Sequence, residues 1–158
     1  MRTKKHKTRQ IEPDPKYNSV LVAKLVNRSM RSGKKEIARK HVYQALENAS
    51  KKLKLKPAEI VEQIVEKVAP KKEVRSRRVG GASYQIPVPV KPRRATSLVL
   101  RWLVVEANKR PNKEYKTYAN KLTAEILAAF EDKGGAIDKR NQSHRMAQAN
   151  KAFAHFRW

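Results

Sequence analysis

Apolar residues recur at helical spacing along most of the chain, separated by polar positions. Five such segments predict α-helices, at about 19–32, 34–54, 57–69, 93–110 and 113–133. Their ends carry the residues that start or stop helices: Pro57 suits a first helical position, Pro111 breaks the fourth segment, and Gly134 closes the fifth. A sixth helix is predicted near the C-terminus, with Asp138 as its N-cap.

The same spacing predicts which side chains face inward. In the second segment the buried stripe includes Ile37 and His41, the latter as a packing residue. Most acidic residues, Glu125 among them, fall on predicted exposed faces at spacings that suit i,i+4 ion pairs. Near the C-terminus, Met146 and Phe153 are predicted to dock the last helix on the core.

Residues 74–90 (VRSRRVGGASYQIPVPV) break the helical pattern and alternate with period two. Gly80 and Gly81 favour a two-residue hairpin turn, because glycine tolerates the positive φ that such turns need. One face of the second strand is apolar or aromatic, consisting of Ala82, Tyr84, Ile86, Val88 and Val90.

Two prolines fix the register of this hairpin. The turn predicts the pairs Val79–Ala82, Val74–Pro87 and Lys72–Pro89. Both proline positions then fall in pairs without hydrogen bonds, where the missing N–H costs least and a third strand cannot add. A lone hairpin is marginally stable in water, so it must lean on a helical body or be completed by a partner.

The predicted fold is mainly α: a bundle of about six helices, with one protruding two-stranded antiparallel β-ribbon at about 72–90 between the third and fourth helices. A chain of 158 residues is sufficient for one domain, here predicted to bind RNA. Residues 1–12 are predicted to form a basic flexible arm, and residues 136–158 a basic helix or tail.

Charge indicates the class of partner. Lys and Arg number 38 against 14 Asp and Glu, which gives a formal net charge of +24. The counterpart of such a chain is a polyanion, and nucleic acid is favoured over membrane because no segment approaches the roughly 20 apolar residues of a membrane span. The N-terminus has no apolar secretion signal and cysteine is absent, so we expect a cytoplasmic location.

Basic residues concentrate in three regions. On the ribbon, Arg75 and Arg77 are predicted to share a face with Tyr84, with Arg78 on the other face, an arrangement that suits insertion between phosphate backbones. Further basic residues surround the ribbon base: Lys71, Lys72, Lys91, Arg93 and Arg94. The alternative is a solvated surface hairpin with ordinary gatekeeper charges.

The termini are the second and third regions. The N-terminal segment carries Arg2, Lys4, Lys5, Lys7 and Arg9, and is interpreted as an arm that orders on RNA or DNA, or as a disordered terminus. The C-terminal segment carries Lys139, Arg140, His144 and Arg145. Its aromatics suit stacking on bases, and the roles of Phe156 and Trp158 stay open. Lys34 and Lys35, at the predicted start of the second helix, hint at a phosphate contact.

No catalytic chemistry is indicated. The four histidines are scattered and no cysteine accompanies them, so no metal site is predicted. Gly33-Lys34-Lys35 lacks the earlier glycine and the following Ser or Thr of a phosphate-binding loop. No nucleophile, base and orienting group assemble, so we expect neither an enzyme nor a cofactor.

Several blocks together resemble small-subunit ribosomal protein seven in its bacterial or organellar form. They are, in order, 14–19 (DPKYNS), Met30 with 33–35 (GKK), 74–87 (VRSRRVGGASYQIP), 101–103 (RWL), 144–147 (HRMA) and 152–158 (AFAHFRW). The resemblance covers nearly the whole chain, and the ribbon and C-terminal blocks are the most specific.

This resemblance implies a structural protein of the ribosome. It implies direct, early binding to the 3′ major domain of 16S-type rRNA, nucleation of head assembly, and a ribbon at the subunit interface near exit-site tRNA and mRNA. Small-subunit proteins nine and eleven would be neighbours, and the protein would be a monomer within the ribosome. The residues implied to lie near tRNA and mRNA are Gly80, Gly81, Ser83, Tyr84 and Gln85.

Two departures from the family pattern, and two rival classes, accompany this interpretation. Asn141-Gln142-Ser143 stands where relatives commonly carry an acidic pair, and some relatives extend beyond the position of Trp158. A DNA-architectural protein would also combine helices, a ribbon and high positive charge. An RNA-modifying enzyme would need a cofactor pocket or a catalytic constellation, and the sequence indicates neither.

Overall fold

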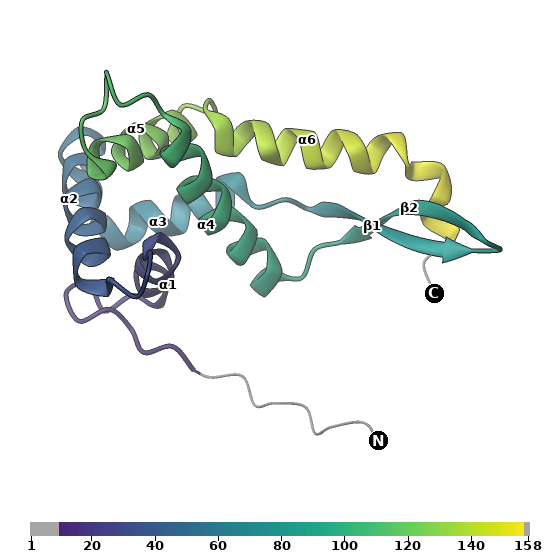
Figure 1. The fold of residues 1–158 in the computed structure, drawn as a ribbon, viewed down its shortest axis with the longest axis horizontal. Coiled ribbons are helices and arrows are strands. Elements are labelled where there is room, and N and C mark those ends of the chain that lie inside the picture. Colours follow the sequence, from purple (N-terminus) through teal and green to yellow (C-terminus); the bar gives the residue numbers. More distant parts are fainter. Residues whose placement is uncertain (1–9, 157–158) are drawn as a thin grey trace.

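The computed structural model describes residues 10–156 as a helical body from which a ribbon and one helix extend side by side (Figure 1). The body consists of the first five α-helices. The extension consists of the two strands, the sixth α-helix and a short 3₁₀ helix. The elements in order are α1 (Val20–Ser29), α2 (Lys35–Leu53), α3 (Pro57–Val68), β1 (Lys72–Val79), β2 (Ala82–Pro89), α4 (Pro92–Lys109), α5 (Tyr118–Phe130), α6 (Gly135–Ala149) and η1 (Lys151–Phe156). The predicted mainly helical fold with one ribbon between α3 and α4 is confirmed.

A capping side chain or a first-turn proline accounts for the starts of α1, α3, α4 and α5. The Ser19 hydroxyl accepts a hydrogen bond from the Val22 N–H, and Pro57 stands at the first turn of α3 as predicted. Two predicted starts were wrong. The Thr117 side chain caps α5, so this helix begins at Tyr118 instead of near residue 113. Gly134, with φ +93°, precedes α6, so Asp138 lies in its first turn and is not the cap.

The core lies among α1 to α5 and the start of α6. Leu25, Leu46, Ile64 and Leu103 are among its fully buried side chains. The prediction for Ile37 was wrong, because α2 turns Ala38, Val42 and the residues that follow inward and leaves Ile37 on its edge, 55% exposed. His41 is partly buried and contacts Tyr118 edge-on, at 6.2 Å between ring centroids.

The prediction that Glu125 is exposed was also wrong. Its side chain is only 2% exposed and accepts hydrogen bonds from Arg110 Nη2 at 2.8 Å and Nε at 3.0 Å. It also accepts one from the Ala136 N–H at 2.9 Å. This carboxylate therefore joins the end of α4, the middle of α5 and the first turn of α6, where negative charge is favourable.

The ribbon has the predicted register. Val79 pairs with Ala82, Val74 with Pro87 and Lys72 with Pro89. Gly80 and Gly81 both adopt positive φ, at 56° and 87°. Within residues 10–156 the sheet has two strands only, as the prolines predict.

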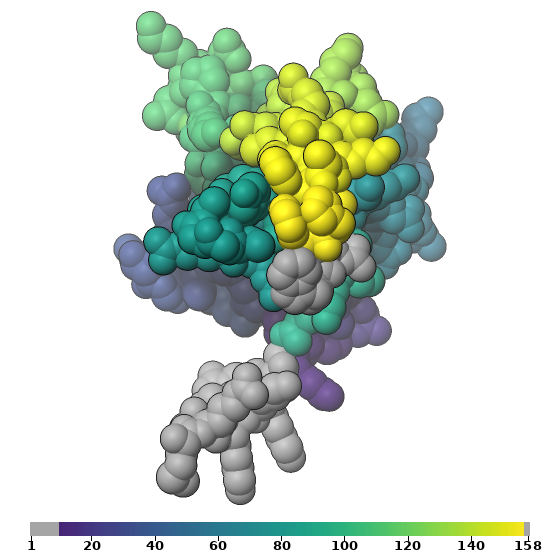
Figure 2. Space-filling view, turned by 90° about the vertical axis from the view of Figure 1, so that its right-hand side faces the viewer, coloured from purple at the N-terminus to yellow at the C-terminus, as the bar shows by residue number. Residues whose placement is uncertain are grey.

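The C-terminal segment supports the ribbon. α6 runs beside it, and Figure 2 shows η1 against the strands when the molecule is viewed from that end. Tyr84 contacts the rings of Phe153 and Phe156, at centroid distances of 5.2 and 5.3 Å. Phe153 therefore docks on the ribbon and not on the helical core. Met146 is 47% exposed, so its predicted burial was wrong.

Candidate nucleic-acid interface

The ribbon base is organised around one buried acid. The Glu73 side chain, 12% exposed, pairs with Arg75 Nη2 at 2.7 Å and Arg94 Nε at 3.3 Å. Burial alone would raise the pKa of Glu73, but hydrogen bonds from Arg75 and Arg94 outweigh it and hold the pKa below its usual value. The pairs orient two of the predicted RNA-binding arginines, which keep exposed side chains, and they join β1 to the start of α4.

The outer ribbon remains a basic, exposed arm. Arg77 and Arg78 are exposed near the turn, as are Ser83 and Gln85. Arg77 Nη1 donates to the Phe156 carbonyl oxygen at 3.5 Å, which adds a polar contact to the aromatic cluster. Tyr84 is half-buried by that cluster, so its ring supports the tail as well as lining the arm.

Two of the predicted RNA-binding residues on α6 make structural contacts. Arg140 Nη1 donates to the Lys67 carbonyl oxygen at 2.6 Å, at the end of α3. His144 Nε2 accepts a hydrogen bond from the Lys71 N–H at 3.0 Å, just before β1. Lys139 and Arg145 make no such link to the ribbon, and Arg145 is exposed. α6 therefore contributes fewer free cations than the sequence suggests.

The His144 contact predicts a pH dependence of stability. Burial lowers the pKa of His144, helped by the nearby positive charges of Arg140 and Lys71, because the accepting ring must be neutral. The contact contributes fully to the free energy of unfolding above about pH 6.5, the pKa of a histidine in the unfolded chain. This contribution is lost as the pH falls from that value toward the lower pKa of His144 in the folded protein. Urea unfolding between pH 5 and 8 should show the wild type losing stability relative to His144→Gln on acidification. Parallel pH profiles would contradict this assignment.

A basic groove that the sequence interpretation missed lies between α1 and α4. Lys24 and Arg28 come from α1, Arg93 and Ser97 from α4, and Leu100 is among the apolar lining. The signal was present, since Lys24 and Arg28 are four residues apart on the polar side of the first predicted helix. The sequence does not reveal that α1 packs against α4. This packing brings Lys24 and Arg28 beside Arg93, which follows the ribbon.

The remaining predicted residues are placed as follows. Lys34 and Lys35 are exposed at the start of α2, whose N-cap, Lys34, makes no side-chain capping bond. Arg2, Lys4, Lys5, Lys7 and Arg9 lie outside the described residues, as does Trp158. The proposal that residues 1–12 form a flexible arm therefore stays a prediction.

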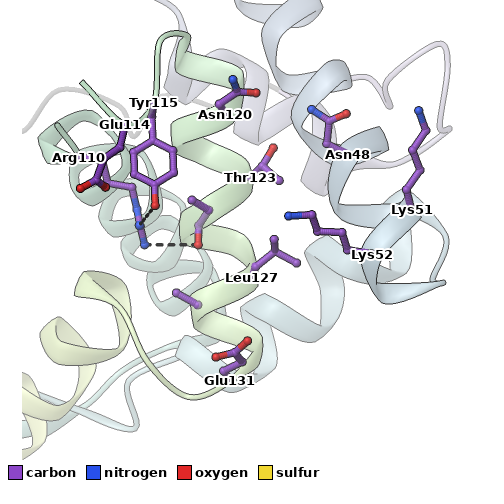
Figure 3. A pocket seen from close by; sticks show the side chains of 12 residues that line it. Asn48, Lys51, Lys52, Arg110, Glu114, Tyr115, Asn120, Thr123, Leu127 and Glu131 are labelled. Atoms are coloured by element: carbon purple, nitrogen blue, oxygen red, sulfur yellow. Dashed lines mark hydrogen bonds between the residues drawn. The ribbon is translucent and has the colours of Figure 1, made fainter. Parts of the chain in front are cut away.

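A wider groove between α2 and α5 has a different character (Figure 3). Lys51 and Lys52 on α2 are accompanied by Glu114 and Glu131 at its rim, and Arg110 is engaged by Glu125 and Tyr115. None of the predicted RNA-binding residues lines this groove. Its mixed charge gives a polyanion little net attraction, so Lys51 and Lys52 serve below as matched controls.

Other site classes find little support in the described part of the chain. Among residues 10–156, no group of three or more His, Cys, Asp or Glu side chains could hold a metal ion. In the same residues, no helix is long and apolar enough to cross a membrane.

Comparison with known proteins gives a consistent result. Residues 1–151 match the protein family described as Ribosomal protein S7p/S5e. The Small ribosomal subunit protein uS7 of Dichelobacter nodosus is 52% identical over 150 residues, which cover 95% of this chain and 94% of that protein. The protein of the same name from Thermosipho africanus is 51% identical over 158 residues, with both chains fully covered.

Proposed function

Because the chain belongs to the ribosomal protein S7p/S5e family, and is therefore a structural, non-enzymatic constituent of the small ribosomal subunit, we propose that it binds the 3′ major domain of 16S-type rRNA directly. On this proposal it binds early and nucleates assembly of the subunit head. It acts in translation as one rRNA-binding domain spanning residues 1–158, within a cytoplasmic ribosome.

One observation carries the proposal: the cations of the α1–α4 groove and those of the ribbon base meet at the start of α4. Lys24 and Arg28 line the groove with Arg93, while the next residue, Arg94, pairs with Glu73 at the base of β1. Cations of the body and of the arm thus lie next to each other at the start of α4, which suits several phosphates of a folded RNA. Specificity would come from the shape of this surface, since RNA helices are recognised mainly by shape and backbone.

The arm has a separate proposed role. Eight residues per strand extend it roughly 20 Å or more at about 3.3 Å per residue, far enough to reach beyond the body. We place its tip, with Gly80, Gly81, Ser83, Tyr84 and Gln85, at the subunit interface near exit-site tRNA and mRNA. Small-subunit proteins nine and eleven are the proposed protein neighbours.

A filter-binding titration tests the rRNA proposal. At about physiological salt, the protein should prefer the isolated 3′ major domain over an unrelated structured RNA of equal length by roughly 10³-fold, the lower end of specificity ratios known for DNA readers. The affinity should also fall steeply as salt rises, because bound phosphates release counterions. Equal binding to both RNAs would reject the proposal. Tighter binding to duplex DNA would favour the architectural class instead.

A further inference from the structure

Two short, non-helical links join the ribbon to the helical body. Residues 69–71 connect α3 to β1, and residues 90–91 connect β2 to α4. In the described part of the chain, the strand backbones lie close to α6, and that of β2 to η1, but to no helix from α1 to α5. An ion pair between Arg94 and Glu73 joins β1 to α4, but the Arg94 side chain is 46% exposed, so the pair holds the ribbon only weakly. The links alone therefore leave the direction of the ribbon open.

α6 holds the first of these links at both ends. Arg140 Nη1 donates to the Lys67 carbonyl oxygen at 2.6 Å, in the last turn of α3. On the other side of the link, His144 Nε2 accepts from the Lys71 N–H at 3.0 Å, and Ser143 Oγ donates at 3.0 Å to the carbonyl oxygen of the first residue of β1. Arg140, Ser143 and His144 stand at i, i+3 and i+4, so one face of α6 carries all three. These three hydrogen bonds, the α6 clasp, fix the angle between α3 and the ribbon.

Two helices of the body fix the start of α6. Glu125 of α5, only 2% exposed, accepts a hydrogen bond from the Ala136 N–H at 2.9 Å. Glu106 of α4 lies directly against Gly135, because a Cβ at this glycine would lie 2.7 Å from Glu106 Oε2, 2.8 Å from its Cγ and 3.0 Å from its Cβ. The residue that precedes α6 supplies no side-chain cap, so these contacts from α4 and α5 determine where the helix begins.

α6 is one continuous helix between its start and the ribbon (Figure 1). Its 15 residues span roughly 22 Å at about 1.5 Å per residue. A tilt of about 5° at its start would therefore displace its far end by roughly 2 Å. The ribbon must follow such a displacement, because Tyr84 packs on Phe153 and Phe156 in the segment that continues α6.

We propose that Gly135, Glu106 and Glu125 act as positioning residues for the ribbon. They set the direction of α6, and α6 transfers this direction to the ribbon through the α6 clasp and the rings of η1. The ribbon is then held in one direction before any partner binds, so binding does not have to order it. This inference goes beyond the proposed function and does not depend on which RNA the chain binds.

Distances between spin labels measure the direction of the ribbon in the free, full-length protein. The chain contains no cysteine, so Ala82→Cys beside the ribbon turn can be paired with Asn27→Cys on α1 or with Asn120→Cys on α5. All three positions are exposed. In the otherwise unchanged chain, we expect pulsed electron paramagnetic resonance to show one narrow distance distribution for each pair. Distributions as broad as those of a freely pivoting arm would overturn the proposal.

Gly135→Ala tests the start of α6. The added methyl group does not fit against Glu106 Cβ and Cγ, so α6 must move away from α4, and at least one of the two distances should shift by roughly 2 Å or more. Adding Glu106→Ala removes most of the obstructing atoms and should reverse most of the shift. Leu46→Ala is the control. Leu46 is fully buried in α2, which does not contact α6 among the described residues, so this variant should lose stability without a change in either distance.

A second variant removes the α6 clasp itself. Arg140→Met, Ser143→Ala and His144→Ala together should broaden both distance distributions. In this background Gly135→Ala should shift the distances less than in the intact chain, because its effect reaches the ribbon through the clasp. Circular dichroism first checks that each variant is folded, and if Gly135→Ala is not, the clasp variant decides. Unchanged distributions in Gly135→Ala or in the clasp variant, or an equal shift in Leu46→Ala, would overturn the proposal.

Discussion

Replacing Arg110 with alanine is expected to lower the free energy of unfolding by about 3–5 kcal/mol. The Glu125 carboxylate is 2% exposed, and Arg110 is the only cation that pairs with it among residues 10–156. Without Arg110 the charge stays buried, held by the Ala136 N–H alone. Urea unfolding followed by circular dichroism measures the effect.

The adjacent lysine is the control. Lys109 pairs with Glu106 at 2.8 Å, but its side chain is 60% exposed, so Lys109→Ala should cost no more than about 1 kcal/mol. A second variant, Arg110→Met with Glu125→Leu, removes both charges together and should be far less destabilising than Arg110→Ala. If Arg110→Ala matched Lys109→Ala, Glu125 would not depend on Arg110, and the junction of α4, α5 and α6 would need another explanation.

Neutralising the α1–α4 groove should produce the largest loss of RNA affinity. The triple variant Lys24→Gln, Arg28→Gln and Arg93→Gln is expected to bind the 3′ major domain roughly a hundredfold more weakly, since each charged hydrogen bond contributes about 1.5–3 kcal/mol without full additivity. The salt slope should fall by about two to three units, one per phosphate contact. Filter binding at several salt concentrations provides both quantities.

A triple variant on another face controls for net charge. It also removes three positive charges, by the substitutions Lys51→Gln, Lys52→Gln and Lys56→Gln. These lysines are all exposed, at the end of α2 and in the loop that follows. We expect less than about a fivefold loss of affinity from this variant, because screening limits distant charges. Equal losses from the two triple variants would show that total charge, and not the groove, determines affinity. Unfolding curves should be close to wild type for both.

The ribbon could be predicted in detail because its determinants are local. Gly80 and Gly81 specify the turn, and Pro87 and Pro89 leave one register in which their missing N–H groups are harmless. Most helices could be predicted for the same reason, because hydrophobic periodicity and capping residues act within a few residues of the chain. Even there, the Thr117 cap outweighed the earlier polar residues and shortened α5.

The candidate site was less predictable because it depends on tertiary packing. Periodicity assigns Glu125 to a polar face, and only the packing of α4 and α6 reveals that this face is closed. A basic residue likewise looks like an RNA contact until its partner is known, as with Arg140 and His144, which hold α3 and β1. Conversely, Lys24 and Arg28 were missed, since a solvated helix face and one wall of a groove have the same sequence pattern.

The support of the ribbon by α6 and η1 also sets an order of events during synthesis of the chain. The ribbon ends at Pro89, but α6 begins at Gly135, about 46 residues later. At about 5–20 residues per second, a ribosome needs roughly 2–9 s to make that interval. Throughout it the hairpin lacks the rings of Phe153 and Phe156 and the acceptor at His144, and a lone hairpin is marginally stable. The arm therefore matures last although it is made in the middle of the chain, and the proline-blocked outer edge of β2 limits pairing of the nascent protein with other strands on that side in the meantime.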